Sequence, residues 1–251
     1  MSQPINLEYD ENCFFQGSSN NLLIAFFSRR LDKNMSLSFG DTRESSNNRR
    51  LFCEGLKIDY RTLVCAEQIH DNKIKYVELQ DLGKGALIYD TCIKGVDALI
   101  TDNKDIPLAI FTADCLSVFL YDRGAPAIGL VHAGWRGTKE NITPGTLQLM
   151  LHQFNSKISD VYVGFGPAIR ECCYEVGKEF FELFPDNLYK RDNRYYLDLV
   201  KINKRQLLDL GVRQENILDS GICTSCSNDK FFSYRKEGNA CARMMSVIML
   251  R

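Results

Sequence analysis

The sequence predicts a mixed α/β domain of the α+β type, in which strands outnumber helices. Short apolar runs alternate with turn-forming residues along the chain, which is typical of many short strands. Three longer stretches repeat their apolar residues with helical periodicity. The chain has no heptad pattern, no repeat of solenoid length and no low-complexity tract. We therefore expect residues 1–251 to form one domain of packed helices and sheets.

The apolar runs predict strands at residues 22–27, 98–100, 108–111, 116–121, 127–131, 161–163 and 246–250. The helical patterns cover residues 45–56, 144–154 and 199–210. We expect Thr143 to cap the second helix with Pro144 at its first position, and Gly211 to end the third. The polar stretch 186–194 is predicted to be a surface loop.

Composition and charge exclude several classes of protein. Hydrophobic residues make up 45% of the chain and charged residues 25%, which is the balance of a globular protein. The formal net charge of -1 gives no overall attraction to nucleic acid or to an anionic membrane. The apolar runs are too short to span a bilayer, and residues 1–16 do not form an apolar leader. We therefore expect a cytoplasmic protein whose ten cysteines are largely reduced.

The segment 108–137 carries the strongest chemical signal. Two β-rich runs are separated by residues 122–125, whose Asp and Gly favour a hairpin turn. If Tyr121 faces Pro126, antiparallel register places Cys115 directly opposite His132 at the open end of the hairpin. A β-bulge would break this register.

A facing cysteine and histidine are compatible with three interpretations. They can share a metal ion, they can form a thiolate–imidazolium pair for nucleophilic catalysis, or they can be a buried thiol and a core histidine. Their setting favours a functional site, because Gly134 and Gly137 follow His132 in a tight turn. Asp114 adds a carboxylate that can transfer protons.

His70 is the natural third metal ligand among the three histidines of the chain. It follows a β-like run and precedes a charged turn, as a ligand carried on a loop would. His152 lies in an amphipathic helical pattern, where a solvated or half-buried position is expected. Three protein ligands would leave a fourth position open, which distinguishes a catalytic zinc site from a structural one.

The other cysteines and arginines give weaker signals. Cys223 and Cys226 have the spacing of half a zinc knuckle or of a redox pair. Because no second such pair accompanies them, we expect plain structural cysteines there, and burial for the adjacent Cys172 and Cys173. Four arginines lie beside Gly, Ser or Asn and are candidate binders of phosphate or carboxylate: Arg29, Arg49, Arg136 and Arg235.

Several motifs together resemble the peptidoglycan editing factor family, once described as laccase-domain polyphenol oxidases. The matching segments are ADC (113–115), HAGWRG (132–137), GPAI (166–169), CCYEV (172–176), FFSYR (231–235), QIH (68–70), VDALIT (96–101) and the N-terminal AFFSR, GD and NNRR. They cover nearly the whole chain in one order. Two positions depart from the family pattern: Asp71 stands where glycine is usual, and the C-terminal motif reads Ala242-Arg243-Met244.

The resemblance implies a layered α/β/β/α fold and a metal site of His70, Cys115 and His132. It implies Zn²⁺, with Cu²⁺ as a possible adventitious occupant, since three histidines are too few for a multicopper oxidase. The implied activity is phosphorolysis of adenosine, inosine, guanosine and S-methyl-5′-thioadenosine, together with adenosine deamination. The expected partners are therefore nucleoside and phosphate, with no nucleic acid and no membrane, in a monomer or homodimer.

For this chemistry we assign catalytic roles to Cys115, His132 and Asp114, with Asp114 transferring protons. Phosphate binding is assigned to three of the arginines: Arg29, Arg49 and Arg136. Two alternatives stay open. One is a metal-free Cys–His hydrolase in which Cys115 attacks an amide. The other is an editing role on cell-wall precursors.

Overall fold

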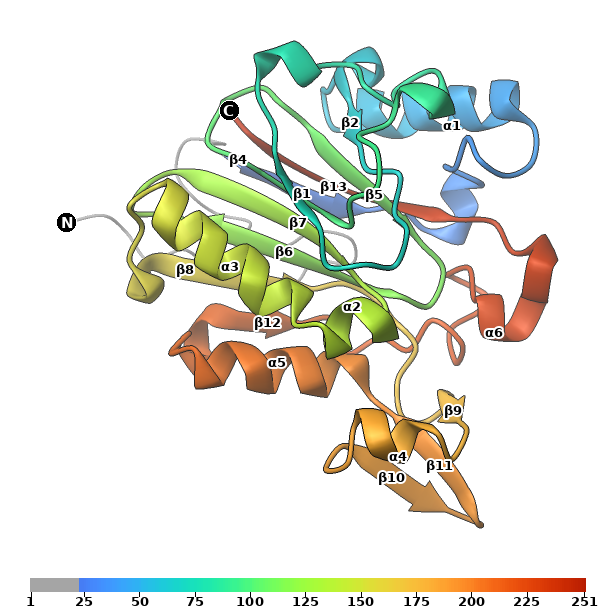
Figure 1. The fold of residues 1–251 in the computed structure, drawn as a ribbon. Helices are drawn as coiled ribbons and strands as arrows, with labels where there is room; N and C mark the ends of the chain where they lie inside the picture. The colour runs from blue at the N-terminus through green and yellow to red at the C-terminus, as the bar shows by residue number, and fades with distance from the viewer. Residues whose placement is uncertain (1–22) are drawn as a thin grey trace.

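Residues 23–251 are described by a computed structural model, and Figure 1 shows their arrangement. The strands of the larger sheets are β1 (Leu23–Phe27), β2 (Val64–Cys65), β3 (Ile74–Tyr76), β4 (Ala98–Thr101), β5 (Leu108–Thr112), β6 (Leu116–Asp122), β7 (Ala127–Ala133), β8 (Val161–Phe165), β12 (Ile217–Asp219) and β13 (Met244–Leu250). A small sheet contains β9 (Glu175–Val176), β10 (Leu188–Arg191) and β11 (Arg194–Leu197). The helices are α1 (Thr42–Gly55), α2 (Trp135–Lys139), α3 (Ile142–Gln153), α4 (Phe180–Leu183), α5 (Leu199–Asp209) and α6 (Tyr234–Glu237).

Two mixed sheets pack face to face between outer helices. The four-stranded sheet has the order β1-β13-β5-β2, and the six-stranded sheet has the order β12-β8-β6-β7-β4-β3. Apolar side chains of β5 and β13 meet those of β6 and β7 in the central core. Helix α1 covers the outer face of the four-stranded sheet, and α3 and α5 cover the outer face of the six-stranded sheet (Figure 1). This is the predicted α/β/β/α layering.

The central strands are buried on both faces. Every residue of β6 and β7 is buried, so both strands read as continuous apolar runs rather than alternating ones. In β6, Phe119 faces the other sheet, while Val118 and Leu120 face the helices. Because both faces are covered, a side chain near the end of β6 or β7 is held in a fixed direction.

The helix ends follow their capping residues. Asp41 accepts hydrogen bonds from Arg43 N and Glu44 N at the start of α1, and Asp198 caps α5 in the same way. Gly211 follows α5 with φ +102°, as expected for a glycine that ends a helix. Thr143 is not an N-cap, because α3 begins one residue earlier, after Asn141.

Three other predictions were wrong. The stretch 186–194 is not a loop, since β10 and β11 form a hairpin there. The β6–β7 register pairs Asp122 with Ala127, so the turn lies one residue later than predicted. The turn expected after His132 is the start of helix α2. Leu22, placed in the first predicted strand, lies outside the described residues.

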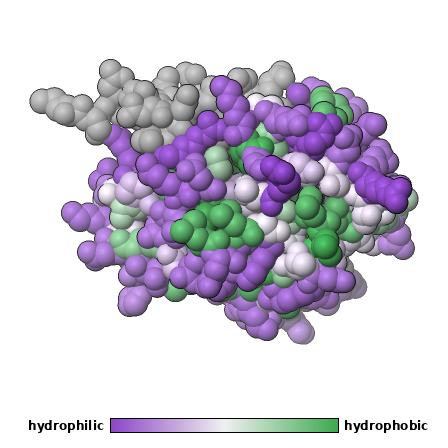
Figure 2. Space-filling view, turned by 90° about the horizontal axis from the view of Figure 1, so that it is seen from above, coloured by the Kyte–Doolittle hydropathy of each residue, from purple (hydrophilic) through white to green (hydrophobic). Residues whose placement is uncertain are grey.

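One face of the molecule, seen in Figure 2, is mainly hydrophilic with separate hydrophobic patches. Within residues 23–251, no helix combines the length and the apolar character needed to cross a membrane. The exposed large apolar side chains include Leu79, Leu87 and Ile88.

Candidate metal centre and active-site cavity

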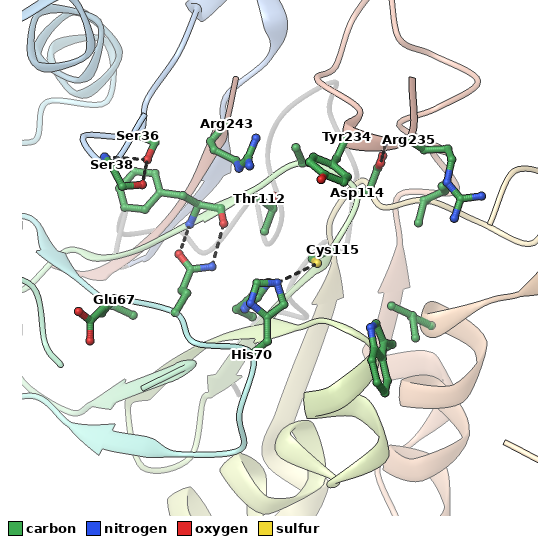
Figure 3. A pocket seen from close by; sticks show the side chains of 18 of the residues that line it. Ser36, Ser38, Glu67, His70, Thr112, Asp114, Cys115, Tyr234, Arg235 and Arg243 are labelled. Atoms are coloured by element: carbon green, nitrogen blue, oxygen red, sulfur yellow. Dashed lines mark hydrogen bonds between the residues drawn. The ribbon is translucent and has the colours of Figure 1, made fainter. Parts of the chain in front are cut away.

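His70, Cys115 and His132 converge at one end of the central core. Their ligand atoms all lie within 4.8 Å of one another. The Cys115 Sγ is 3.9 Å from His70 Nε2, and the two imidazole rings lie edge to face with centroids 4.7 Å apart (Figure 3). His132 is buried, Cys115 is half-buried and His70 is exposed, so the group opens to solvent on one side. The trio predicted from the sequence is therefore assembled.

The hairpin brings Cys115 and His132 together although their predicted register was wrong. His132 pairs with Ser117, not with Cys115. The pairing differs from the prediction by two residues, and side chains two residues apart in a strand point to the same face. Cys115, just before β6, therefore still lies on the face of His132 and reaches it diagonally.

A buried carboxylate, Asp97, positions both histidines. It immediately precedes β4, whose pairing with β7 places it beside His132. His132 Nδ1 donates to Asp97 Oδ1 at 2.7 Å, which leaves Nε2 to face the other ligands. The backbone N–H groups of Ile69, His70 and Asp71 also donate to this carboxylate, at 2.9–3.1 Å. One side chain thus orients an imidazole and holds the loop that carries His70, whose φ is +61°.

Gly134 leaves the space in which the three ligands meet. A Cβ at this position would lie 3.2 Å from His70 Cδ2 and 3.3 Å from Cys115 Sγ. Its backbone, with φ -72° and ψ 176°, is ordinary for any residue, so the glycine is required for space and not for conformation.

The three ligands polarise one another. Burial acts to raise the pKa of the Cys115 thiol, but the charge of His132 and hydrogen bonds from both imidazoles outweigh it and lower this pKa to about 6. Burial acts to lower the pKa of His132, but the Cys115 thiolate and the Asp97 carboxylate raise it to about 9. A thiolate beside two imidazoles is a donor set suited to Zn²⁺ or copper. The donor types, their convergence and the gap over Gly134 fit a metal ion bound by these residues.

A cavity of about 420 Å³ adjoins the metal centre, within the range of small-molecule sites. Its lining includes aromatic side chains on several sides: Tyr89, Phe111, Trp135, Tyr174 and Tyr234. Ser36, Ser38 and Arg243 lie at one end, and Arg235 lies at the other (Figure 3). The cavity therefore combines flat apolar surfaces with cationic groups.

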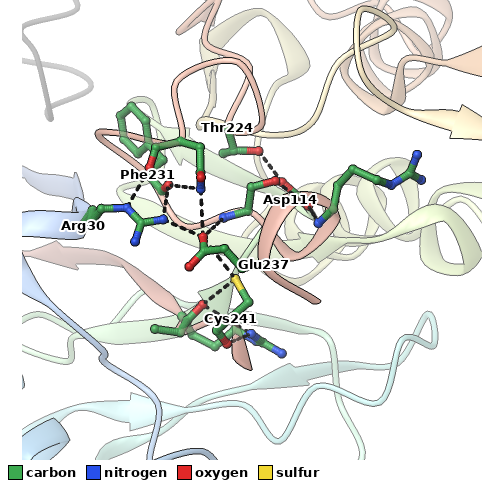
Figure 4. Close-up of polar contacts among 11 residues, drawn as sticks. Arg30, Asp114, Thr224, Phe231, Glu237 and Cys241 are labelled. Carbon is green, nitrogen blue, oxygen red and sulfur yellow. Dashed lines mark hydrogen bonds and ion pairs between the residues drawn. The ribbon is translucent and has the colours of Figure 1, made fainter. Parts of the chain in front are cut away.

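Asp114 lines this cavity but is held by three hydrogen bonds. Its Oδ1 accepts from Thr224 Oγ1 at 2.6 Å, and its Oδ2 accepts from Ser233 Oγ at 3.1 Å and from Arg235 N at 2.7 Å (Figure 4). Asp114 has φ +81°, a conformation that costs a non-glycine residue energy and that these contacts stabilise. The Asp114 carboxylate thus holds the loops that carry Thr224, Ser233 and Arg235 at the wall of the cavity.

The three arginines assigned to phosphate occupy different places. Arg49 lines the cavity but is buried, with Nε on the Met35 carbonyl and Nη1 on the Gly85 and Ala86 carbonyls. Arg136 is exposed and stacks on Trp135 at 4.4 Å. Arg29 is half-buried, and neither it nor Arg136 is among the cavity-lining residues.

Two functional candidates were missed by sequence reasoning. Asp97 lies in the VDALIT segment, and its signal was an acidic residue at the start of an otherwise apolar strand. Arg243 lies in the Ala-Arg-Met segment, where an arginine directly before a buried strand was the available signal. The position of each residue beside the site depends on strands that lie far from it in the sequence. His152 is exposed on α3, as predicted.

Comparison with known proteins decides the family. A family model described as multi-copper polyphenol oxidoreductase laccase matches residues 28–251. The chain belongs to this family. Among relatives of this laccase-domain family, the purine nucleoside phosphorylase YlmD of Geobacillus stearothermophilus is 37% identical over 225 residues, covering 86% of this chain and 82% of the relative.

A solved structure supports the same relationship. The crystal structure of YlmD from Geobacillus stearothermophilus matches with a TM-score of 0.88 and 32% identity, covering 99% of this chain and 100% of that chain. The adenosine deaminase RL5, from an unknown prokaryotic organism, is 29% identical over 192 residues, covering 73% of each. The relatives of this laccase-domain chain are thus purine nucleoside phosphorylases and an adenosine deaminase.

Proposed function

We propose that this chain is a zinc-dependent purine nucleoside phosphorylase that also deaminates adenosine. The expected substrates are adenosine, inosine, guanosine and S-methyl-5′-thioadenosine. The observation that carries the proposal is the convergence of His70, Cys115 and His132 beside a cavity lined by aromatic and cationic side chains. The names of the relatives supply the reaction class.

His70, Cys115 and His132 would hold the ion, and Asp97 would keep His132 in the required tautomer. When bound there, Zn²⁺ would supply a Lewis acid beside the cavity. Cys115 would bind as a thiolate, which its lowered pKa already favours. Copper in the same site remains an adventitious occupant in this proposal.

In phosphorolysis, a phosphate oxygen bonds to the ribose C1′ while the bond from C1′ to the purine N9 breaks. The products are ribose 1-phosphate and the free base. An aromatic side chain such as Trp135 or Tyr234 would stack on the purine, and both line the cavity. Guanidinium groups would bind the phosphate through charge-assisted hydrogen bonds.

Arg243 is the phosphate ligand of this proposal, because it lines the cavity between Ser36 and Tyr234, although its Nη1 also donates to the carbonyls of Cys241 and Ala242. Arg49, from the original assignment, would act from the cavity wall by its charge, since carbonyl groups already bind its donors. Arg29 and Arg136 would contact phosphate only after rearrangement, because neither lines the cavity.

In deamination, water replaces the 6-amino group of the purine and ammonia leaves. Asp114 was assigned to proton transfer on sequence grounds. Its three hydrogen bonds favour a positioning role, which holds Arg235 and the loop after Thr224 against the cavity.

The metal-free Cys–His hydrolase is the second candidate. It is favoured by the thiolate–imidazolium polarisation of Cys115 and His132, completed by Asp97. The two functions differ in what zinc does to Cys115. If Cys115 coordinates zinc in a phosphorylase, the metal should protect its thiolate from alkylation by iodoacetamide. If Cys115 is the nucleophile of a metal-free hydrolase, added zinc should inhibit the hydrolase. The cell-wall editing role stays a prediction from the family resemblance.

The deciding experiment measures hypoxanthine released from inosine in zinc-replete buffer, with and without phosphate. We expect release that depends on phosphate. Cys115→Ala and His70→Ala should lower it by at least about 100-fold, because each removes a ligand of the Lewis acid. His152→Ala is the matched control, since this exposed histidine lies on α3 away from the site, and its activity should equal wild type.

Absence of phosphate-dependent release by the wild-type protein would contradict the phosphorylase assignment. Hydrolysis of an amide substrate that persists after chelation and is lost when Cys115 is alkylated would support the metal-free hydrolase instead.

A further inference from the structure

Four cysteines that the catalytic proposal does not use meet at a second place in the fold. Cys172, Cys173, Cys223 and Cys226 have their Sγ atoms within 4.8 Å of one another. The Cys226 Sγ lies 3.4 Å from that of Cys172 and 3.3 Å from that of Cys173. Cys172 and Cys173 thus supply the second pair that the spacing around Cys223 and Cys226 did not reveal. The burial expected for Cys172 and Cys173 was wrong, because Cys172 is exposed and Cys173 is half-buried; Cys226 is also exposed, while Cys223 is buried.

We infer that Cys172, Cys173, Cys223 and Cys226 form a second metal site, one that takes a thiophilic divalent cation, Zn²⁺, in tetrahedral coordination. With Zn–S bonds of about 2.3 Å, a tetrahedron has sulfur–sulfur edges of about 3.8 Å. The distances from the Cys226 Sγ to those of Cys173 and Cys172, 3.3 and 3.4 Å, lie just below this value, and all four sulfurs lie within 4.8 Å of one another. All four thiols lose their protons on binding, so the closed site carries a charge of about -2.

The backbone around the cluster is already fixed. Cys223 pairs with Ala168 in a parallel β-bridge, and its carbonyl accepts from Ser227 N at 2.9 Å. Cys173 N donates to the Arg170 carbonyl at 2.9 Å. Backbone hydrogen bonds thus hold two turns that are far apart in sequence with their thiols directed to one point. A single disulfide would use two of these sulfurs and would leave the other two unexplained.

Cationic groups surround the loop that carries the first cysteine pair. Arg191 Nη2 donates to the carbonyls of Glu171 and Cys172, at 2.7 and 3.2 Å. Arg235 donates to the carbonyls of Cys173 and Glu175, at 3.4 and 2.9 Å. These guanidinium groups partly offset the negative charge of a four-thiolate site.

This second site would join two walls of the active-site cavity. Cys172 and Cys173 lie between Ile169 and Tyr174, which both line the cavity. The loop of Cys223 and Cys226 includes Thr224, which donates to Asp114. A metal bound there would hold both loops in the arrangement that shapes the cavity, without contacting substrate.

Metal content tests the inference directly. The wild-type protein, purified under reducing conditions with zinc and then desalted, should contain two zinc ions per chain by mass spectrometry. The Cys172→Ser/Cys226→Ser variant replaces two exposed thiols and should contain one. Cys241→Ser is the control, because Cys241 is a buried thiol outside both clusters, and it should retain two. Equal zinc content in the double variant and wild type would overturn the inference.

X-ray absorption on a Cys115→Ala variant gives a test that leaves all four cysteines intact. Its zinc should be surrounded by four sulfur atoms at about 2.3 Å. Zinc without sulfur neighbours, no bound zinc, or a Cys172–Cys226 disulfide in the reduced preparation would each overturn the second site. This result is independent of the phosphorylase proposal, which depends on Cys115.

Discussion

At the scale of single residues, the metal centre depends on Gly134 as much as on its ligands. Most glycines are needed for backbone freedom, but the φ of Gly134 is allowed to any residue. The constraint is the 3.2–3.3 Å separation between its absent Cβ and the side chains of His70 and Cys115. A methyl group there would press against the side chains of both candidate ligands and displace them.

We therefore predict that Gly134→Ala folds but loses metal. Overpacking of about 1–3 kcal/mol corresponds to a zinc affinity that is about 5- to 160-fold weaker. Competition with a chromogenic chelator measures this change. Gly55→Ala is the control, because a Cβ at Gly55 meets nothing within 4 Å, and its zinc affinity should not change. Unchanged affinity in Gly134→Ala would show that the ligands do not meet over this residue.

At the scale of secondary-structure elements, Asp97 connects parts of the chain that do not adjoin in sequence. Its backbone carbonyl accepts from His132 N at 2.8 Å, and its side chain accepts from His132 Nδ1 and from the loop after β2. Burial acts to raise the pKa of Asp97, but the hydrogen bond from His132 outweighs it and lowers this pKa. Asp97 is thus an anion that links β4, β7 and the His70 loop.

Asp97→Asn should weaken zinc binding by about 10- to 100-fold, as is usual when a carboxylate behind a ligating histidine is lost. The backbone N–H groups of residues 69–71 now donate to the Asp97 carboxylate. In the variant they would face the side-chain amide of asparagine instead. Zinc affinity and inosine phosphorolysis should fall together. Asp122→Asn is the control, because this equally buried aspartate closes the β6–β7 turn and should leave zinc affinity unchanged.

At the scale of the whole molecule, the metal centre lies where the two sheets meet, with one ligand from a loop and two from a hairpin. Binding to the folded state alone adds about 4 kcal/mol of stability when zinc exceeds its dissociation constant a thousandfold. For a chain of this length that corresponds to a Tm increase of about 10 °C. Chelation should remove the increase, and calorimetry measures it.

The size of this increase should depend on pH in a defined direction. Between about pH 6 and 9 the unmetallated site holds a proton on His132 that zinc must displace. Below about pH 6 the site holds a second proton, on the thiol of Cys115. The zinc-induced rise in Tm should therefore grow as pH rises toward 9 and shrink steeply below 6. A rise that is independent of pH would argue against binding by these ligands.

The sequence predicted the central strands well because they are buried on both faces, and continuous apolar runs are their direct signature. It failed at β10 and β11, a short hairpin in which only Leu197 is buried, so that charged and aromatic residues give no clear apolar pattern. The register of β6 and β7 was displaced by two residues because turn length alone did not locate the turn. The metal trio survived this error because the displacement preserved the face of each side chain.

The sequence alone determined the strand-rich fold class and the central strands, since local periodicity is a property of short segments, and its residues and family resemblance singled out the three candidate ligands that the fold brings together. Only the tertiary structure decided that Asp97 lies behind His132, that Arg243 lies at the cavity, and that four cysteines from two distant turns meet. Those contacts depend on how sheets and loops pack, and residues separated by 35 or more positions carry no spacing rule that predicts them.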